Sequence, residues 1–181
     1  MAPSTLILDA EAITRALQRL GDEILEHNPT PARFALVGIP LRGHELARRL
    51  ADVVEQRQGR RPETGVVDVS MHRDDFKLRR SLPRVHATEL PIRLEEYTLI
   101  LVDDVVFTGR TCRAAMDAIS SYGRPARIQF AVLVDRGHRE LPIRPDYVGT
   151  CLTTDRHDLV KVRLQGVDDE PEGVRVETSA T

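Results

Sequence analysis

Three short, largely apolar runs constrain the fold of this chain more than any other feature. Each is a candidate buried strand, and segments with apolar residues at helical spacing separate them. Buried strands that alternate with helices predict an α/β domain with a mostly parallel sheet covered on both faces. The runs are RFALVGI at 33–39, YTLILV at 97–102 and RIQFAVLV at 127–134.

The rest of the pattern fits a single domain spanning residues 1–181. The first helix is expected to be capped by Asp9, and a short alternating strand, VKVRL, precedes an acidic tail at about 165–181. The long polar stretch at about 72–96 predicts a loop or lid, because loops of this length usually serve function. The predicted helices are 10–26, 45–57 and 111–122, and a further β-branched strand is predicted at 64–72.

Composition narrows the class of protein. With 181 residues, 41% of them hydrophobic, the chain can bury a substantial core. The net charge of −2 excludes a wholly basic nucleic-acid binder but leaves a local basic face open. The two cysteines show no metal-ligand spacing, which favours reduced thiols. The sequence shows no secretory signal and no apolar stretch approaching about 18 residues, so we expect a soluble cytoplasmic protein without a membrane span.

The segment LILVDDVVFTGRT at 99–111 combines a buried strand with two adjacent carboxylates and a glycine turn. In open α/β sheets, ligands bind beyond the carboxyl ends of the strands, where Asp103 and Asp104 are expected. The turn Thr108–Thr111 leads into a predicted helix, whose first amides and positive dipole end favour a phosphate. The carboxylates can then accept hydrogen bonds from sugar hydroxyls or stand near a hydrated Mg²⁺. Both can reach one ligand only if the strand begins to turn near Asp104.

Other interpretations of the acidic pair were weighed. An acidic strand end can simply cap the next helix. A Walker-B aspartate requires a GxxxxGK[ST] loop, which the sequence lacks. A receiver-type acidic pocket would place its carboxylates near the first strand. The adjoining TGRT turn favours the phosphate site over all three.

These thirteen residues resemble the 5-phosphoribosyl-1-diphosphate (PRPP) motif of type I phosphoribosyltransferases. The segments LDAEAITRAL, LVGIPLRG, VDVSMHRDDF and LVDRGHRELPIRPDYVG are similar to the PyrR family, pyrimidine-operon attenuators that are also uracil phosphoribosyltransferases. The resemblance covers nearly the whole chain. It implies the type I fold, a mostly parallel sheet flanked by helices, with a flexible lid and a small hood region.

The family reaction joins uracil to PRPP, giving UMP and diphosphate with Mg²⁺. By this resemblance, Asp103, Asp104 and Arg42 are the catalytic residues, with Mg²⁺ held mainly by PRPP near the two aspartates. The segment Leu41-Arg42-Gly43 matches the diphosphate loop, where family members often have an unusual peptide geometry. The full set implied for PRPP binding is Leu41, Arg42, Gly43, Asp103, Asp104, Val105, Val106, Phe107, Thr108, Gly109, Arg110 and Thr111.

The resemblance also implies a base site, an RNA site and an oligomer. Arg136 and the backbone near Val160 are the expected uracil contacts, and His138 is left out of the catalytic set. Arg15 and Arg19 are expected to face pyrimidine-operon leader RNA, whose binding would respond to UMP. Relatives form dimers, which predicts a homodimer or a higher homo-oligomer. Acidic residues near the expected RNA face, at positions 22, 155 and 158, predict weakened or altered RNA binding.

Two alternative functions stay open at the level of sequence. One is an attenuator that mainly binds RNA and uses PRPP and UMP as signals. The other is a phosphoribosyltransferase for a different base, because backbone groups that a sequence does not reveal often recognise pyrimidine edges.

Overall fold

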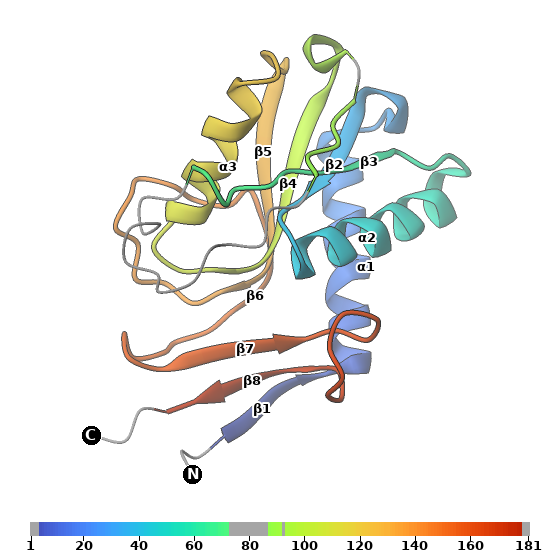
Figure 1. Ribbon diagram of the computed structural model, residues 1–181. Coiled ribbons are helices and arrows are strands. Elements are labelled where there is room, and N and C mark those ends of the chain that lie inside the picture. Colours follow the sequence, from blue (N-terminus) through green and yellow to red (C-terminus); the bar gives the residue numbers. More distant parts are fainter. Residues whose placement is uncertain (1–3, 73–86, 92, 179–181) are drawn as a thin grey trace.

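The computed structural model describes residues 4–72, 87–91 and 93–178. They form a five-stranded parallel sheet and, below it in Figure 1, a three-stranded antiparallel sheet. The order in the large sheet is β3-β2-β4-β5-β6 and in the small one β1-β8-β7. The α/β class with a parallel central sheet is therefore confirmed. The large-sheet strands are β2 Phe34–Gly38, β3 Glu63–Val66, β4 Thr98–Val106, β5 Arg127–Asp135 and β6 Tyr147–Cys151.

Helices cover both faces of the large sheet. Figure 1 shows α1 (Ala10–His27) and α2 (Arg42–Gln58) on one face and α3 (Arg110–Ser120) on the other. Asp9 caps α1 as predicted, accepting a 2.8 Å hydrogen bond from the amide of Ala12. Two short 3₁₀ turns, Pro31–Arg33 and Leu94–Glu96, lead into β2 and β4.

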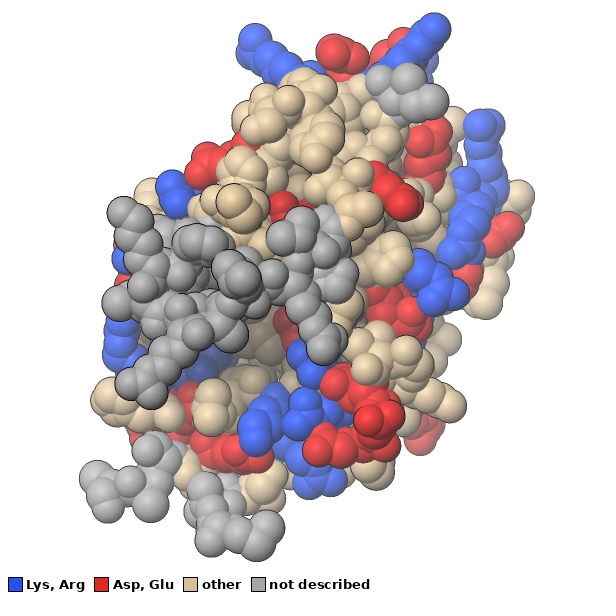
Figure 2. All heavy atoms as spheres, in the orientation of Figure 1, with Lys and Arg blue, Asp and Glu red and all other residues tan. Residues whose placement is uncertain are grey.

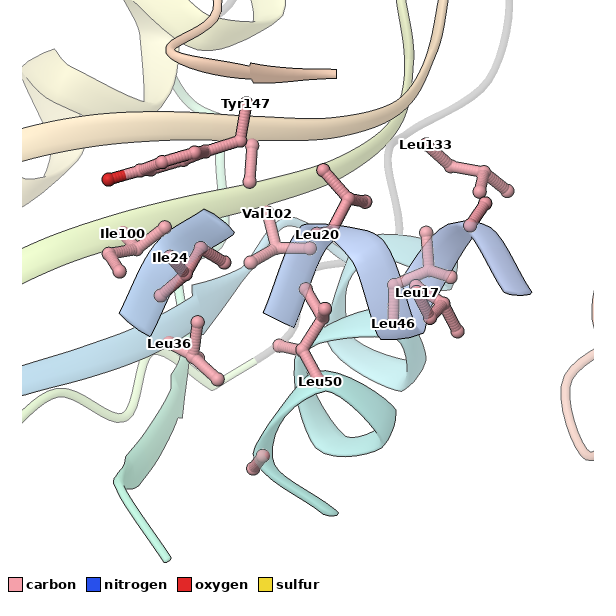
Figure 3. Packing of buried hydrophobic residues seen from close by; sticks show 14 of the residues in the cluster. Leu17, Leu20, Ile24, Leu36, Leu46, Leu50, Ile100, Val102, Leu133 and Tyr147 are labelled. Atoms are coloured by element: carbon pink, nitrogen blue, oxygen red, sulfur yellow. The ribbon is translucent and has the colours of Figure 1, made fainter. Parts of the chain in front are cut away.

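The core consists of two hydrophobic clusters, one on each face of the large sheet. Alternate residues of a strand point to opposite faces, so Ile100 and Val102 join the α1–α2 cluster while Leu99 and Leu101 join the α3 cluster. Figure 3 shows part of the first cluster, in which side chains of α1 and α2 meet Leu36, Ile100 and Tyr147, among others, from the strands of the large sheet. Because the middle strands are covered on both sides, their carboxyl ends are held rigidly.

We call the small sheet, with the turn 164–172, the hood. Its strands are β1 Ser4–Asp9, β7 Leu159–Arg163 and β8 Gly173–Glu177. Two arginines of α2, seven positions and about two turns apart, bind hood carboxylates with two hydrogen bonds each: Arg42 binds Asp168 and Arg49 binds Glu172. Bidentate arginine–carboxylate pairs fix orientation as well as distance. On the face shown in Figure 2, basic and acidic side chains are intermixed over the region of the hood, not segregated into one basic patch.

Several element boundaries differ from the sequence predictions. The strand predicted at 64–72 ends at Val66, and α2 begins at Arg42 instead of 45. The predicted tail at 165–181 contains β8, which pairs with both β1 and β7. Most of the predicted lid (residues 73–86 and 92) lies outside the described residues. Of the described helices, not one is long and apolar enough to cross a membrane.

Candidate active site

The carboxyl end of β4 and the first turn of α3 line a cavity of about 230 Å³. Its lining includes all seven residues from Val105 to Thr111, together with Asp103, Cys112 and Phe130. Most of the predicted PRPP motif thus surrounds one space. Burial and, to a smaller extent, the nearby charge of Asp103 together raise the pKa of the Cys112 thiol to about 12, so this thiol is protonated at neutral pH.

The acidic pair lies within β4 and not at a turn. The strand continues to Val106, but its pairing with β5 includes Asp103 and Val105 and omits Asp104, so the regular ladder is interrupted at this residue. The carboxyls of Asp103 and Asp104 are hydrogen-bonded to each other, which places both where one ligand can reach them. The amide of Asp104 donates to Asp103 Oδ1, and the amide of Val105 donates to Asp104 Oδ1, both at 2.9 Å. Burial raises the pKa of the Asp104 carboxyl, opposed by hydrogen bonding to Asp103 and by the charge of Arg42.

The connection between β4 and α3, residues 107–109, is held by its carbonyl groups. Three consecutive carbonyls accept hydrogen bonds from the segment 136–141: Val106 from the Arg136 amide, Phe107 from the Arg139 guanidinium, and Thr108 from the amides of Glu140 and Leu141. The N–H and C=O of a trans peptide point in opposite directions, so the amides of residues 107–109 point away from that segment. Gly109 ends the connection with φ +91°, a left-handed conformation that favours glycine. This backbone presents donors suited to an anion at the start of α3.

The predicted diphosphate loop packs directly against the acidic strand. A Cβ on Gly43 would lie 2.3 Å from the carbonyl oxygen of Val102 and 3.2 Å from Asp103 Cα, so only glycine allows this approach. The amide of Ile39 donates to the same Val102 carbonyl. The peptide bond between Pro40 and Leu41 is cis, which is the unusual geometry that the resemblance implied.

Arg42 is paired with the hood. Its Nε and Nη2 atoms donate to the two carboxylate oxygens of Asp168, at 3.0 and 2.6 Å. The hydrogen bond to Arg42 lowers the pKa of the Asp168 carboxyl, and the amide of Leu164 also donates to this carboxylate. Because the charge of Arg42 also acts on Asp104, the arginine lies between the acidic pair and the hood.

Arg136, predicted to contact uracil, makes its described contacts with other parts of the protein. Its side chain is buried, its Nη atoms donate to backbone carbonyls in the loop 152–158, and its guanidinium carbon lies 4.2 Å from the centre of the Phe107 ring. Val160 lies in β7, immediately after that loop. His138, with φ +60°, binds the carbonyl of Thr154 through Nε2 and contacts the Phe107 ring edge to face, which fits a structural role.

The two arginines predicted to face RNA both have partners within the protein. Arg15 pairs with Glu11 at 2.8 Å on the exposed side of α1, and Arg19 donates to the carbonyl of Gly149 in β6. The expectation that Asp158 faces RNA is wrong: the residue is 9% exposed and its carboxylate accepts the amide of Asp155. Asp155 is itself exposed.

Sequence reasoning missed the residues that support the site. Arg139 donates to the carbonyls of Phe107, Gly137 and Ile143 and to the carboxylate of Asp135. Glu140 bridges Arg110, in the first turn of α3, and Arg156; both arginines lower the pKa of this exposed carboxylate. The only signal was the dense run of charged residues in DRGHRE, which by itself is typical of a solvated loop.

Comparison with known proteins identifies the family. Residues 4–166 match the phosphoribosyl transferase domain. The Bifunctional protein PyrR of Roseiflexus is 50% identical over 176 residues, covering 97% of this chain and 96% of that protein. The protein of the same name from Chloroflexus aurantiacus is 51% identical over 174 residues, covering 96% of each.

Solved structures share the fold at much lower identity. A hypoxanthine phosphoribosyltransferase of Trypanosoma cruzi, in a ternary substrates complex, has a TM-score of 0.75 at 16% identity and covers 97% of this chain and 95% of its own. A hypoxanthine-guanine phosphoribosyltransferase of Bacillus anthracis has a TM-score of 0.72 at 12% identity, covering 99% and 100%. The chain therefore belongs to the phosphoribosyl transferase domain family and, within it, to the bifunctional PyrR proteins.

Proposed function

We propose that this protein transfers a phosphoribosyl group from PRPP to uracil, giving UMP and diphosphate, and regulates pyrimidine genes through leader RNA. The observation that carries the transferase proposal is the cavity at the end of β4, where a loop fixed by its carbonyl groups and the buried carboxylate of Asp103 line one space. Membership of the PyrR family favours uracil over another base. The chain is taken to act as one phosphoribosyltransferase unit.

The proposed roles follow from charge and position. The amides of residues 107–109 and the hydroxyls of Thr108 and Thr111 bind the 5′-phosphate. Asp103 and Asp104 accept hydrogen bonds from the ribose hydroxyls and stabilise the positive charge that develops on the sugar as diphosphate departs. The loop Leu41–Gly43 receives the diphosphate, with Arg42 adding its positive charge and the Nη1 group, which is not part of the bidentate pair with Asp168. The backbone near Val160 reads the base.

We expect Mg²⁺ to enter this site bound mainly to the substrate and to take few ligands from the protein. Among the described residues, no group of three or more His, Cys, Asp or Glu side chains could hold a metal ion. Two adjacent carboxylates suit an ion that keeps its waters and takes its remaining ligands from phosphate oxygens. When bound, Mg²⁺ would neutralise charge on the departing diphosphate.

Formation of UMP from labelled uracil, PRPP and Mg²⁺ tests the transferase proposal. We expect turnover with uracil and little with adenine, guanine or hypoxanthine. Changing both Asp103 and Asp104 to Asn keeps the volume of the side chains and removes their charge, so activity should collapse while the fold is retained. Preference for another base would overturn the substrate assignment, and wild-type turnover by the double variant would overturn the ribose roles.

The regulatory role has a separate test. A gel shift with pyrimidine-operon leader RNA, with and without UMP, should show binding that UMP strengthens. Because Arg15 pairs with Glu11 and Arg19 donates to the carbonyl of Gly149, we expect these two arginines to add little to that binding. RNA binding without UMP formation would favour the alternative of a pure attenuator. We further propose that the protein acts in the cytoplasm as a homodimer or a higher homo-oligomer.

A further inference from the structure

Arg136 combines burial with the absence of an ion pair. The residue is 6% exposed, and within the described part of the chain no carboxylate oxygen lies within 4 Å of its guanidinium. Burial accordingly lowers the pKa of the guanidinium, and only the more distant charge of Asp158 opposes that effect. Removing a cation from water without a counter-ion is unfavourable, so the contacts that Arg136 makes must account for its place in the fold.

Those contacts join two segments that are far apart in sequence. On one side, Nη1 donates to the carbonyl of Asp158 and Nη2 to that of Asp155, both at 2.8 Å, with Arg156 accepting at 3.4 Å. On the other side, the guanidinium stacks on Phe107, which lines the cavity. The loop 152–158 is thereby fastened to the connection between β4 and α3.

The two fastened segments are the two halves of the proposed site. The connection 107–109 holds the phosphate side, and Leu159 and Val160, directly after the loop, lie on the base side. We propose that Arg136 is a positioning residue for phosphoribosyl transfer, which sets the distance between the bound sugar phosphate and the bound base. This inference rests on the proposed function. Transfer between two bound reactants is sensitive to such spacing, since a displacement of about 1 Å can lower the rate about 100-fold.

Steady-state kinetics of R136M and R136K test the proposal. Lysine keeps the charge but lacks the planar fork that reaches three carbonyls and stacks on a ring, so both variants should be impaired. The carbonyls of residues 106–108 keep their bonds to backbone amides and Arg139 in either variant. We therefore expect the KM for uracil to rise about tenfold and kcat to fall, while the KM for PRPP stays within about threefold.

The matched control is R124M, which removes an exposed arginine between α3 and β5 and should behave as the wild type. R136K serves as the second variant should R136M fail to fold. An equal change in the two KM values, or no change in either, would overturn the proposal, because a residue that only supports the fold alters the amount of active protein and not one substrate alone.

Limited trypsin digestion measures the positioning without any substrate. The carbonyl of Arg156, whose peptide bond is a trypsin site, is one of the groups that Arg136 holds. Cleavage after Arg156, identified by mass, should be at least about tenfold faster in R136M and R136K than in the wild type or R124M. Wild-type cleavage rates in both variants would refute the positioning. If the wild-type protein formed no UMP, the proposed function would be overturned. The cleavage rates would still show, independently of activity, whether Arg136 fastens the loop 152–158.

Discussion

Replacing Gly43 with alanine tests how closely the diphosphate loop must approach the acidic strand. The added Cβ would lie 2.3 Å from the Val102 carbonyl oxygen, whereas ordinary contact begins near 3.4 Å. Both the oxygen and the nearby Asp103 Cα are backbone atoms, so no side-chain rotation relieves the clash. The start of α2 and the middle of β4 must therefore separate by about 1 Å.

The size of the effect follows from that displacement. Overpacking a close-packed site costs about 1–3 kcal/mol of stability, and a shift of about 1 Å between groups that must act together costs about 100-fold in rate. We expect kcat/KM for UMP formation to fall about 100-fold in G43A, with a decrease of about 1–3 kcal/mol in the free energy of unfolding measured in urea.

A second glycine provides the control. A Cβ on Gly21 would lie 2.5 Å from Val53 Cγ1, a side chain between α1 and α2 and remote from the cavity. G21A should lose stability yet keep kcat/KM within about threefold of the wild type. If G43A retained wild-type kcat/KM, the close approach of loop and strand would have no part in the reaction.

Three further predictions concern titratable groups. Because the folded state raises the pKa of Asp104, D104N should increase the free energy of unfolding at neutral pH. This gain in stability should grow as the pH rises from about 4 and vanish below the pKa that the carboxyl has in the unfolded chain. A lower free energy of unfolding for D104N at neutral pH would contradict the prediction. The pKa of Asp168 is lowered instead, so D168N should reduce stability at neutral pH, and the deficit should fade as pH falls below about 4; melting curves at pH 3 and 7 distinguish the two signs. At pH 8 a thiol reagent should label exposed Cys151 rapidly and buried Cys112 only on unfolding; fast labelling of both would refute the burial of Cys112.

The parallel sheet was predictable because its signal is local. The strands around positions 36, 100 and 132 are short, largely apolar runs, and the helices between them show regular apolar spacing. The hood was not predicted in the same way. β8 is a short alternating segment, GVRVE, inside an acidic stretch, and it becomes a strand by pairing with β1, more than 160 positions away. Such distant pairing leaves almost no trace in a single sequence.

The site shows the same division between local and distant causes. The motif 103–111 is contiguous, so its residue types could be interpreted directly. What fixes it comes from elsewhere: Gly43 by close approach, Arg139 by its bond to the Phe107 carbonyl, and Arg136 by stacking. These contacts depend on tertiary geometry, so the stacking of Arg136 on Phe107 could not be predicted from the sequence.

The strand order of the hood bears on when the protein becomes complete during synthesis. Strand β8, residues 173–177, lies between β1 and β7 in the small sheet. This sheet therefore cannot form until residues 173–177 have left the ribosome. The large sheet and its helices need only residues up to 151. Until β8 has been synthesised, the hood that Arg42 and Arg49 bind is incomplete. A nascent chain would therefore form the loop proposed to bind phosphate before the segment proposed to bind the base is fixed in place.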